Sequence, residues 1–200
     1  IKGPDKFPLD PGRWGYLPAE IQTMLREVNA DCQISKTNTS IKDNHPCLLR
    51  HGVEISNKQS FISCISDLIF FGKKMLDKTG IPQMATILNI SDMKKRIIKS
   101  ISIDTFIKYQ NGNLVTNFQN LNKKVNIEKY NDTKLYQKLN IREKTEDAEY
   151  FTKVVSAFEN FVDFLSDEDA VVDHTYLWDI ISMPNKYLFP DGVNMVIFNL

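Results

Sequence analysis

The sequence is poor in cysteine: its 200 residues contain only Cys32, Cys47 and Cys64. Three is an odd number, and no two of them are close enough along the chain to form a paired motif. Folds that depend on disulfides use an even number of cysteines at regular spacings. We therefore expect no disulfide framework and a reducing compartment. We expect Cys47 and Cys64 to be small buried groups beside Leu48 and Ile65.

The sequence also lacks the short motifs that bind phosphates or position a nucleophile. Its eight glycines are scattered, and neither a GxxxxGK phosphate loop nor a GxSxG elbow is present. His174 follows Asp173, with Asp179 further along the chain, and we interpret this group as a cap at a helix start, not as an acid–base pair. A nucleophile made of Cys47 and a histidine would rest on chance proximity alone. The sequence thus predicts no catalytic residue, no cofactor and no enzyme.

A zinc site would have to draw on Cys32, His45, Cys47 and His51, all of which are competent ligand types. Structural zinc sites usually present two cysteines close together in the chain as one knuckle, and this sequence has no such pair. We therefore predict no metal site.

Long hydrophobic runs are missing as well. No apolar run reaches the roughly 18 residues of a membrane-spanning helix, and polar residues interrupt the longest one, residues 61–71. The chain opens on Ile1, and its first residues resemble neither a signal nor a transit peptide. Residues 193–200 are mostly apolar and predict a final strand. We expect a non-membrane chain taken from the interior of a larger protein.

Helical periodicity is what the sequence does have. The clearest helix is predicted between residues 148 and 165, where spacings of three and four place six apolar residues on one face: Ala148, Phe151, Val155, Phe158, Val162 and Leu165. Shorter helices are predicted at 18–28, 57–72, 91–101, 105–110 and 174–182, with an Asn-Gly turn at 111–112. Extended segments are few. The predicted fold class is α/β of the α+β kind, helix-rich with a small mixed or antiparallel sheet.

Within these helices the apolar stripes predict which side chains face the core. The first helix carries Ile21, Met24, Leu25 and Val28 on one stripe, and the second turns Phe61, Ile65, Leu68 and Ile69 inward. The third, capped by Ser91, turns Met93, Ile97, Ile98 and Ile101 inward and exposes Lys94, Lys95 and Lys99.

Charge divides the chain, although 25 basic and 25 acidic residues balance overall. Residues 73–144 carry 15 basic and 6 acidic side chains, whereas residues 145–200 carry 2 and 11. We distinguish three parts of one compact domain: residues 1–90, helical or α+β; residues 91–144, basic and DNA-facing; and residues 145–200, acidic, helical and ending in a strand. A basic stretch of this kind can face a polyanion, but it can also pair with the acidic part on folding.

Basic, amide and aromatic residues interleave between residues 94 and 138, as in chains that contact DNA. Lysine and arginine neutralise phosphates, and asparagine can match an adenine edge. The helices at 91–101 and 105–110 could form a pair that presents one member to a groove. An AT-rich genome would enrich lysine everywhere, which does not explain its confinement to the middle of the chain. The predicted phosphate contacts are Lys94, Lys95, Arg96, Lys99, Lys108, Lys123, Lys124, Lys129, Lys134 and Lys138, with Asn111 and Asn113 near bases.

Several short segments resemble a known viral family. The motifs are FPLDPGRWGYLP at 7–18, CLLRHGV at 47–53 and NKQSFISCI at 57–65. They are similar to the large subunit of the early transcription factor of nucleocytoplasmic large DNA viruses. QNGNLV at 110–115, YLWD at 176–179 and LFP at 188–190 resemble the giant-virus branch. The likeness to the poxvirus member is thinner, and the blocks together cover about half of the chain.

This resemblance implies a promoter-recognition subunit found in the virion and, in infected cells, in cytoplasmic viral factories. Such a subunit binds double-stranded AT-rich early promoters, acts with a helicase-like ATPase small subunit and recruits the viral RNA polymerase. The ATPase chemistry belongs to the partner, in line with the absence of a phosphate loop here. The alternative is a non-catalytic interaction or scaffold domain that docks a basic partner through its acidic C-terminal third.

Overall fold

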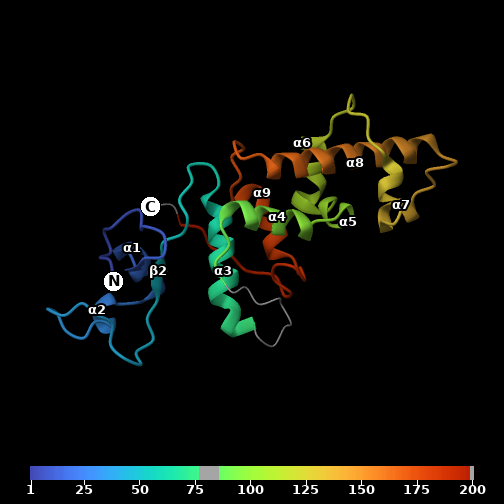
Figure 1. The fold of residues 1–200 in the computed structure, drawn as a ribbon. Helices are drawn as coiled ribbons and strands as arrows, with labels where there is room; N and C mark the ends of the chain where they lie inside the picture. The colour runs from blue at the N-terminus through green and yellow to red at the C-terminus, as the bar shows by residue number, and fades with distance from the viewer. Residues whose placement is uncertain (77–85, 199–200) are drawn as a thin grey trace.

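A computed structural model describes residues 1–76 and 86–198, and Figure 1 shows their arrangement. Four longer helices form the body: α3 (Ser60–Leu76), α4 (Ile90–Ser100), α8 (Thr145–Ser166) and α9 (His174–Ser182). Shorter helices are α1 (Ala19–Leu25), α2 (Asn29–Cys32), α5 (Ile103–Phe106), η1 (Tyr109–Gly112), α6 (Asn113–Phe118), η2 (Ile127–Tyr130) and α7 (Lys134–Lys138). Strands β1 (Trp14–Tyr16) and β2 (Leu49–His51) pair antiparallel. The helix-rich α+β prediction with a small sheet is confirmed, and the sheet is antiparallel.

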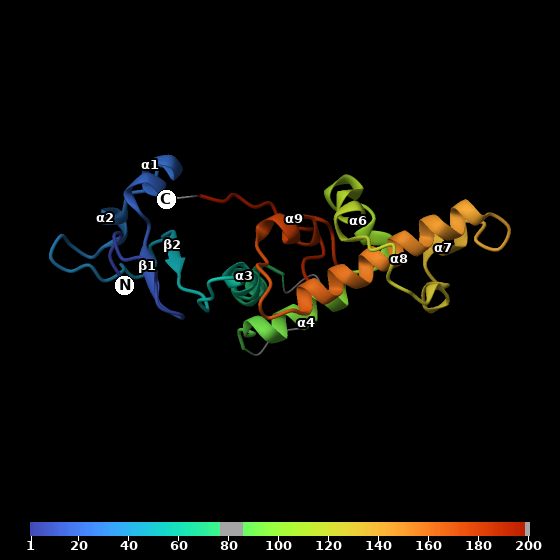
Figure 2. The same ribbon diagram turned by 90° about the horizontal axis from the view of Figure 1, so that it is seen from above.

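Helix α8 confirms the clearest sequence prediction. Phe151, Val155 and Leu165 are buried, as the spacing of three and four requires. Two acidic residues occupy its first turn, where the helix dipole favours negative charge. In Figures 1 and 2 this helix runs along much of the molecule, while residues 1–55 lie at the end remote from α7.

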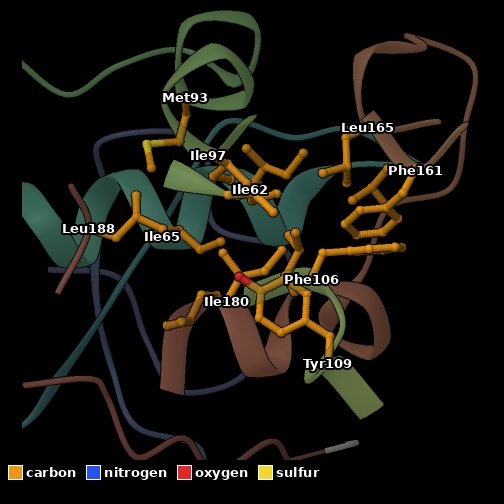
Figure 3. Close-up of a cluster of buried hydrophobic side chains, with 14 of the residues drawn as sticks. Ile62, Ile65, Met93, Ile97, Phe106, Tyr109, Phe161, Leu165, Ile180 and Leu188 are labelled. Carbon is orange, nitrogen blue, oxygen red and sulfur yellow. The ribbon is translucent and has the colours of Figure 1, made fainter. Parts of the chain in front are cut away.

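Two hydrophobic clusters lie along α8. The larger joins α3, α4, α8 and α9, and Figure 3 shows Phe106 and Phe161 within it. The rings of these two residues stack with their centroids 5.3 Å apart. The smaller cluster centres on Ile103, Phe151, Val154 and Val155, and partly buried side chains from residues 125–141 cover it. One amphipathic helix therefore organises both halves of the helical body.

One arginine, Arg50, connects the first residues of the chain to the small sheet through hydrogen bonds. The Arg50 guanidinium on β2 donates to the carbonyl oxygens of Gly3, Pro4, Lys6 and Tyr16 at 2.7 to 3.2 Å. These bonds tie the proline-rich first residues to the β1–β2 pair. Next to β2, a Cβ atom at position 52 would lie 2.1 Å from a backbone oxygen, so only glycine fits there.

Two helix starts differ by a residue or two from the sequence prediction. Asn89 caps α4 through its side-chain oxygen, which accepts from the backbone N–H of Asp92 at 2.8 Å, so the predicted cap Ser91 lies inside the helix. Asparagine and serine cap about equally well, and the sequence offers both, two residues apart. Pro18 is the N-cap of α1, not its first helical residue.

Three predictions of packing are wrong. Residues 193–198 form no strand in the part of the chain that the structure describes; they run back to α1, where Ile197 and Phe198 line a hollow with Met24. Leu68 of α3 is exposed, not inward-facing. Helix α1 buries none of its residues, and Met24 and Leu25 of its predicted stripe are exposed.

Candidate functional site

Lys94 does not lie on the exposed face of α4, and this prediction is wrong. Its side chain is buried, and its ammonium donates to the carbonyl oxygens of Asp167 at 2.8 Å and Ser166 at 3.2 Å and to the amide oxygen of Gln59 at 3.3 Å. Desolvation by burial lowers the pKa of Lys94. Because the Lys94 ammonium is buried and donates to these three oxygens, it is not available to contact a DNA phosphate. We therefore remove Lys94 from the predicted phosphate contacts.

The other cations of α4 are partly engaged. Lys95 pairs with Asp92 one turn earlier at 2.8 Å, in a largely exposed pair. Arg96 is half-buried and donates from Nε to the carbonyl oxygen of Tyr187 at 2.8 Å. Lys99 is exposed, with its ammonium 6.0 Å from the centre of the Tyr187 ring. Among the α4 cations, Lys99 is therefore the freest.

Lys123 is the cation of the basic stretch that pairs with α8. Its ammonium lies 3.2 Å from a carboxylate oxygen of Asp163 and 3.8 Å from one of Glu159, and it donates to Asn160 at 2.8 Å. Within residues 1–76 and 86–198, no other ion pair joins the basic stretch to the acidic C-terminal part. Mutual neutralisation on folding thus accounts for one lysine and not for the stretch as a whole.

Five further lysines of the stretch are exposed and make no ion pair with the described residues: Lys108, Lys124, Lys129, Lys134 and Lys138. Lys129 lies over the ring of Tyr130, with its ammonium 5.3 Å from the ring centre. With Lys99 they make six exposed cations, which we call the open lysines.

Helices α4 and α7, which carry Lys99, Lys134 and Lys138 among the open lysines, contact α8 at two separate positions. Lys94 of α4 contacts Ser166 at the C-terminal end of α8, whereas Tyr136 of α7 packs edge-on against Phe151. Those two positions on α8 are 15 residues apart, a separation of about 22 Å along the helix. In Figure 1, α4, α5 and α7 lie one after another beneath α8. At 3.4 Å per base pair, this length corresponds to roughly six base pairs of duplex.

The predicted helix pair does not present a helix to a groove. Helix α5 is a single turn with Ile103 and Phe106 buried, so its apolar side is taken up by the two clusters. Asn111 and Asn113 are exposed beside it, in the predicted Asn-Gly turn, where Asn111 adopts φ 54° and Gly112 φ 90°. An asparagine tolerates this left-handed conformation better than most residues. Asn111 lies in the left-handed turn at the end of η1, and Asn113 is the first residue of the short helix α6.

Asp173 and His174 form a helix cap, as predicted. The Asp173 carboxylate accepts from the backbone N–H of Thr175 at 2.8 Å, which makes it the N-cap of α9. Asp179 accepts from the backbone N–H of Gln110 at 2.5 Å and so fixes the turn before Asn111. These carboxylates are committed to backbone donors.

Sequence reasoning missed a histidine–carboxylate pair at the sheet. His51 Nδ1 contacts a carboxylate oxygen of Asp67 on α3. The His51 ring also packs against Trp14, with ring centres 4.4 Å apart, and against Phe71 at 4.8 Å. His51 and Asp67 lie 16 residues apart in the sequence and on different elements. No local spacing pattern therefore predicts that they pair. The pair anchors the β1–β2 unit to α3.

The cysteines are also arranged differently from the prediction. Cys32 and Cys47 are joined as a disulfide with their Cα atoms 5.9 Å apart, which corrects the expectation that no cysteines pair. Cys64 is exposed, not buried beside Ile65. His45 approaches the pair, and its ring nitrogen and the two sulfurs lie within 4.8 Å of one another. His51, the fourth ligand type considered, is at the sheet with Asp67.

Comparison with known proteins gives no match: no family model, curated protein or solved structure is similar to this chain at a significant level. The resemblance to the viral transcription-factor subunit therefore stays a prediction. Among the described residues, no helix combines the length and the apolar character that crossing a membrane requires.

Proposed function

We propose that the chain is a promoter-binding segment of a viral early transcription initiation factor, which holds AT-rich double-stranded DNA through the open lysines. The family resemblance supplies the biological setting: a virion factor that acts with a helicase-like ATPase small subunit and the viral RNA polymerase. The observation that carries the proposal is the pairing pattern. The acidic helix α8 engages Lys123 and leaves the six open lysines without an acidic partner among the described residues.

The chemistry of these residues favours backbone contact over base reading. Lysine ammonium groups neutralise phosphates and release counterions, which gives affinity without sequence information. Asn111 and Asn113 supply exposed amides in the one region where base contact is proposed. Preference for AT-rich sequence would then come from these amides or from the shape of the duplex.

Binding of the chain to a fluorescein-labelled AT-rich duplex, measured by fluorescence anisotropy against salt, tests the proposal. If all six open lysines contact phosphate, affinity falls about a thousandfold between roughly 50 and 200 mM salt. The variant carrying Lys129→Glu, Lys134→Glu and Lys138→Glu should lose most of the binding and flatten the salt slope by roughly one unit per lysine.

A matched control carries Lys2→Glu, Lys6→Glu and Lys36→Glu, which are exposed lysines of the N-terminal part, outside the basic stretch. It has the same change in net charge and should bind DNA nearly as the parent does. Equal losses in both triple variants would show a diffuse charge effect and reject the site. Absence of binding even at low salt would reject the DNA proposal and favour the scaffold alternative.

A further inference from the structure

The segment between α2 and β2 brings three strong metal-ligand types to one place. Cys32 is the last residue of α2, and His45 and Cys47 precede β2. Their ligand atoms, two sulfurs and one imidazole nitrogen, lie within 4.8 Å of one another. In the parts of the chain that the structure describes, this is the one such group of three or more.

The loop that carries these residues is held by its own backbone bonds. Gln33 bridges to Ile41, and the N–H of Lys42 donates to the carbonyl oxygen of Cys32 at 2.9 Å. The Lys42 ammonium donates to the carbonyl oxygen of Asp31 at 2.9 Å. These contacts hold residues 41 and 42 against Cys32, a few residues before His45 and Cys47.

The composition of the group fits zinc better than it fits a disulfide alone. A disulfide requires two cysteines and gives His45 no role. Two thiolates and one imidazole are a set that zinc prefers, with Zn–S distances of about 2.3 Å and Zn–N distances of about 2.0–2.1 Å. A tetrahedral site of that size places its ligand atoms roughly 3.5 Å apart. The two sulfurs must therefore separate once their bond is reduced, while the imidazole nitrogen already lies within 4.8 Å of both.

Solvent can reach the site from one side. Cys32 is buried, Cys47 is half-buried and His45 is exposed. The three protein ligands therefore leave a fourth position open to water, as in zinc sites with three protein ligands.

We propose that Cys32, His45 and Cys47 bind Zn²⁺ when the cysteines are reduced, and that the disulfide is the metal-free, oxidised state of the same site. During metal loading, a thiol reductant first transfers two electrons and two protons to the Cys32–Cys47 disulfide. The reductant is itself oxidised to a disulfide. Zn²⁺ then displaces the two thiol protons to solvent and binds the two thiolates and the neutral imidazole. The proposal is independent of DNA binding.

Cobalt binding to the whole chain tests this site. The protein, reduced with a phosphine and freed of metal, is titrated with Co²⁺ and then with Zn²⁺. We expect one Co²⁺ per chain, with thiolate charge-transfer bands in the near ultraviolet and visible bands typical of a tetrahedral ion, both abolished by one equivalent of Zn²⁺. The oxidised protein should bind neither ion at this site.

His45→Ala is the decisive variant because His45 is exposed and the disulfide does not need it. It should keep the fold and the disulfide but weaken Co²⁺ binding by at least about tenfold, since even a second-shell change costs that much. Cys64→Ser is the matched control and should bind as the parent does. The proposal is overturned if reduced protein takes up no stoichiometric ion, or if His45→Ala binds like the parent.

Discussion

The ammonium of Lys94 donates to the backbone carbonyl oxygen of Asp167 at 2.8 Å, at the point where helix α8 ends. Helix C-termini leave carbonyl groups without intrahelical partners and attract positive charge. The same carbonyl accepts from Gln59 at the start of α3 at 2.9 Å. One buried cation therefore joins α3, α4 and α8.

Replacing Lys94 should lower the free energy of unfolding of the protein without a direct effect on DNA contact. Lys94→Ala removes a charged donor from buried carbonyl groups, at a cost of about 1.5–3 kcal/mol. Lys95→Ala, one residue along on the exposed side of α4, should change stability by less than about 0.5 kcal/mol. Urea denaturation followed by circular dichroism measures both. Equal effects of the two variants would show that Lys94 is exposed.

The carboxylate of Asp104 supports α7 from outside that helix. It accepts from the backbone N–H groups of Lys134 at 3.0 Å and Leu135 at 2.9 Å, which are orphan donors in the first turn. Asp104→Ala should destabilise the chain by about 1–2 kcal/mol, as the loss of a helix cap does. If α7 carries DNA-contacting lysines, the same variant should also weaken duplex binding several-fold. Asp132→Ala, an exposed acidic residue of the same stretch, serves as the control.

Tyr130 should make the protein sensitive to alkaline pH. Desolvation, followed by its hydrogen bond to Glu159 at 3.1 Å, raises the pKa of Tyr130 to about 12. The folded state thus holds the phenolic proton more tightly than the unfolded state, whose tyrosines titrate near pH 10. Its contribution to stability is complete below about pH 10 and is lost as pH rises towards 12.

The Tyr130→Phe variant isolates this effect. Its free energy of unfolding should depend less on pH between about 10 and 12 than that of the parent. Chemical denaturation at a series of alkaline pH values gives the comparison. Identical pH dependence in the two proteins would mean that Tyr130 is not perturbed on folding.

Phe161 is the aromatic centre of the larger cluster. It stacks on Phe106 and packs edge-on against Phe118, with ring centres 5.3 and 5.0 Å away. Phe161→Ala should lower the free energy of unfolding by about 3–5 kcal/mol, through lost burial and the cavity left behind. Phe161→Leu should cost less, and Tyr150→Ala, on the exposed side of the same helix, should be nearly neutral. Thermal denaturation ranks the three variants.

The sequence predicted the elements whose signal is local. Helix α8 follows from the spacing between Phe151 and Leu165, and α9 from its Asp173 cap. The turn at Asn111-Gly112 also follows from its residue types. Each of these depends on residues within a few positions of one another.

The errors concern contacts between distant segments. Lys94 looked like a surface lysine because the periodicity of α4 alone cannot show that Gln59 and the end of α8 meet over it. The pairing of Cys32 with Cys47 depends on a loop that folds back at Ile41, and no spacing rule predicts such a fold. The open lysines were expected from composition, but which of them the carboxylates of α8 would engage could be learned only from the three-dimensional arrangement.

The two clusters share α8, α5 and Val115, but their remaining walls differ, so the two halves of α8 should not open together. The half near Ser166 is held by α3, α4 and α9, whereas the half near Phe151 is covered by short segments joined by loops. Backbone amides around Val154 should therefore exchange with deuterium faster than those around Leu165. The α7 side would then melt before the part formed by α3, α4 and α9.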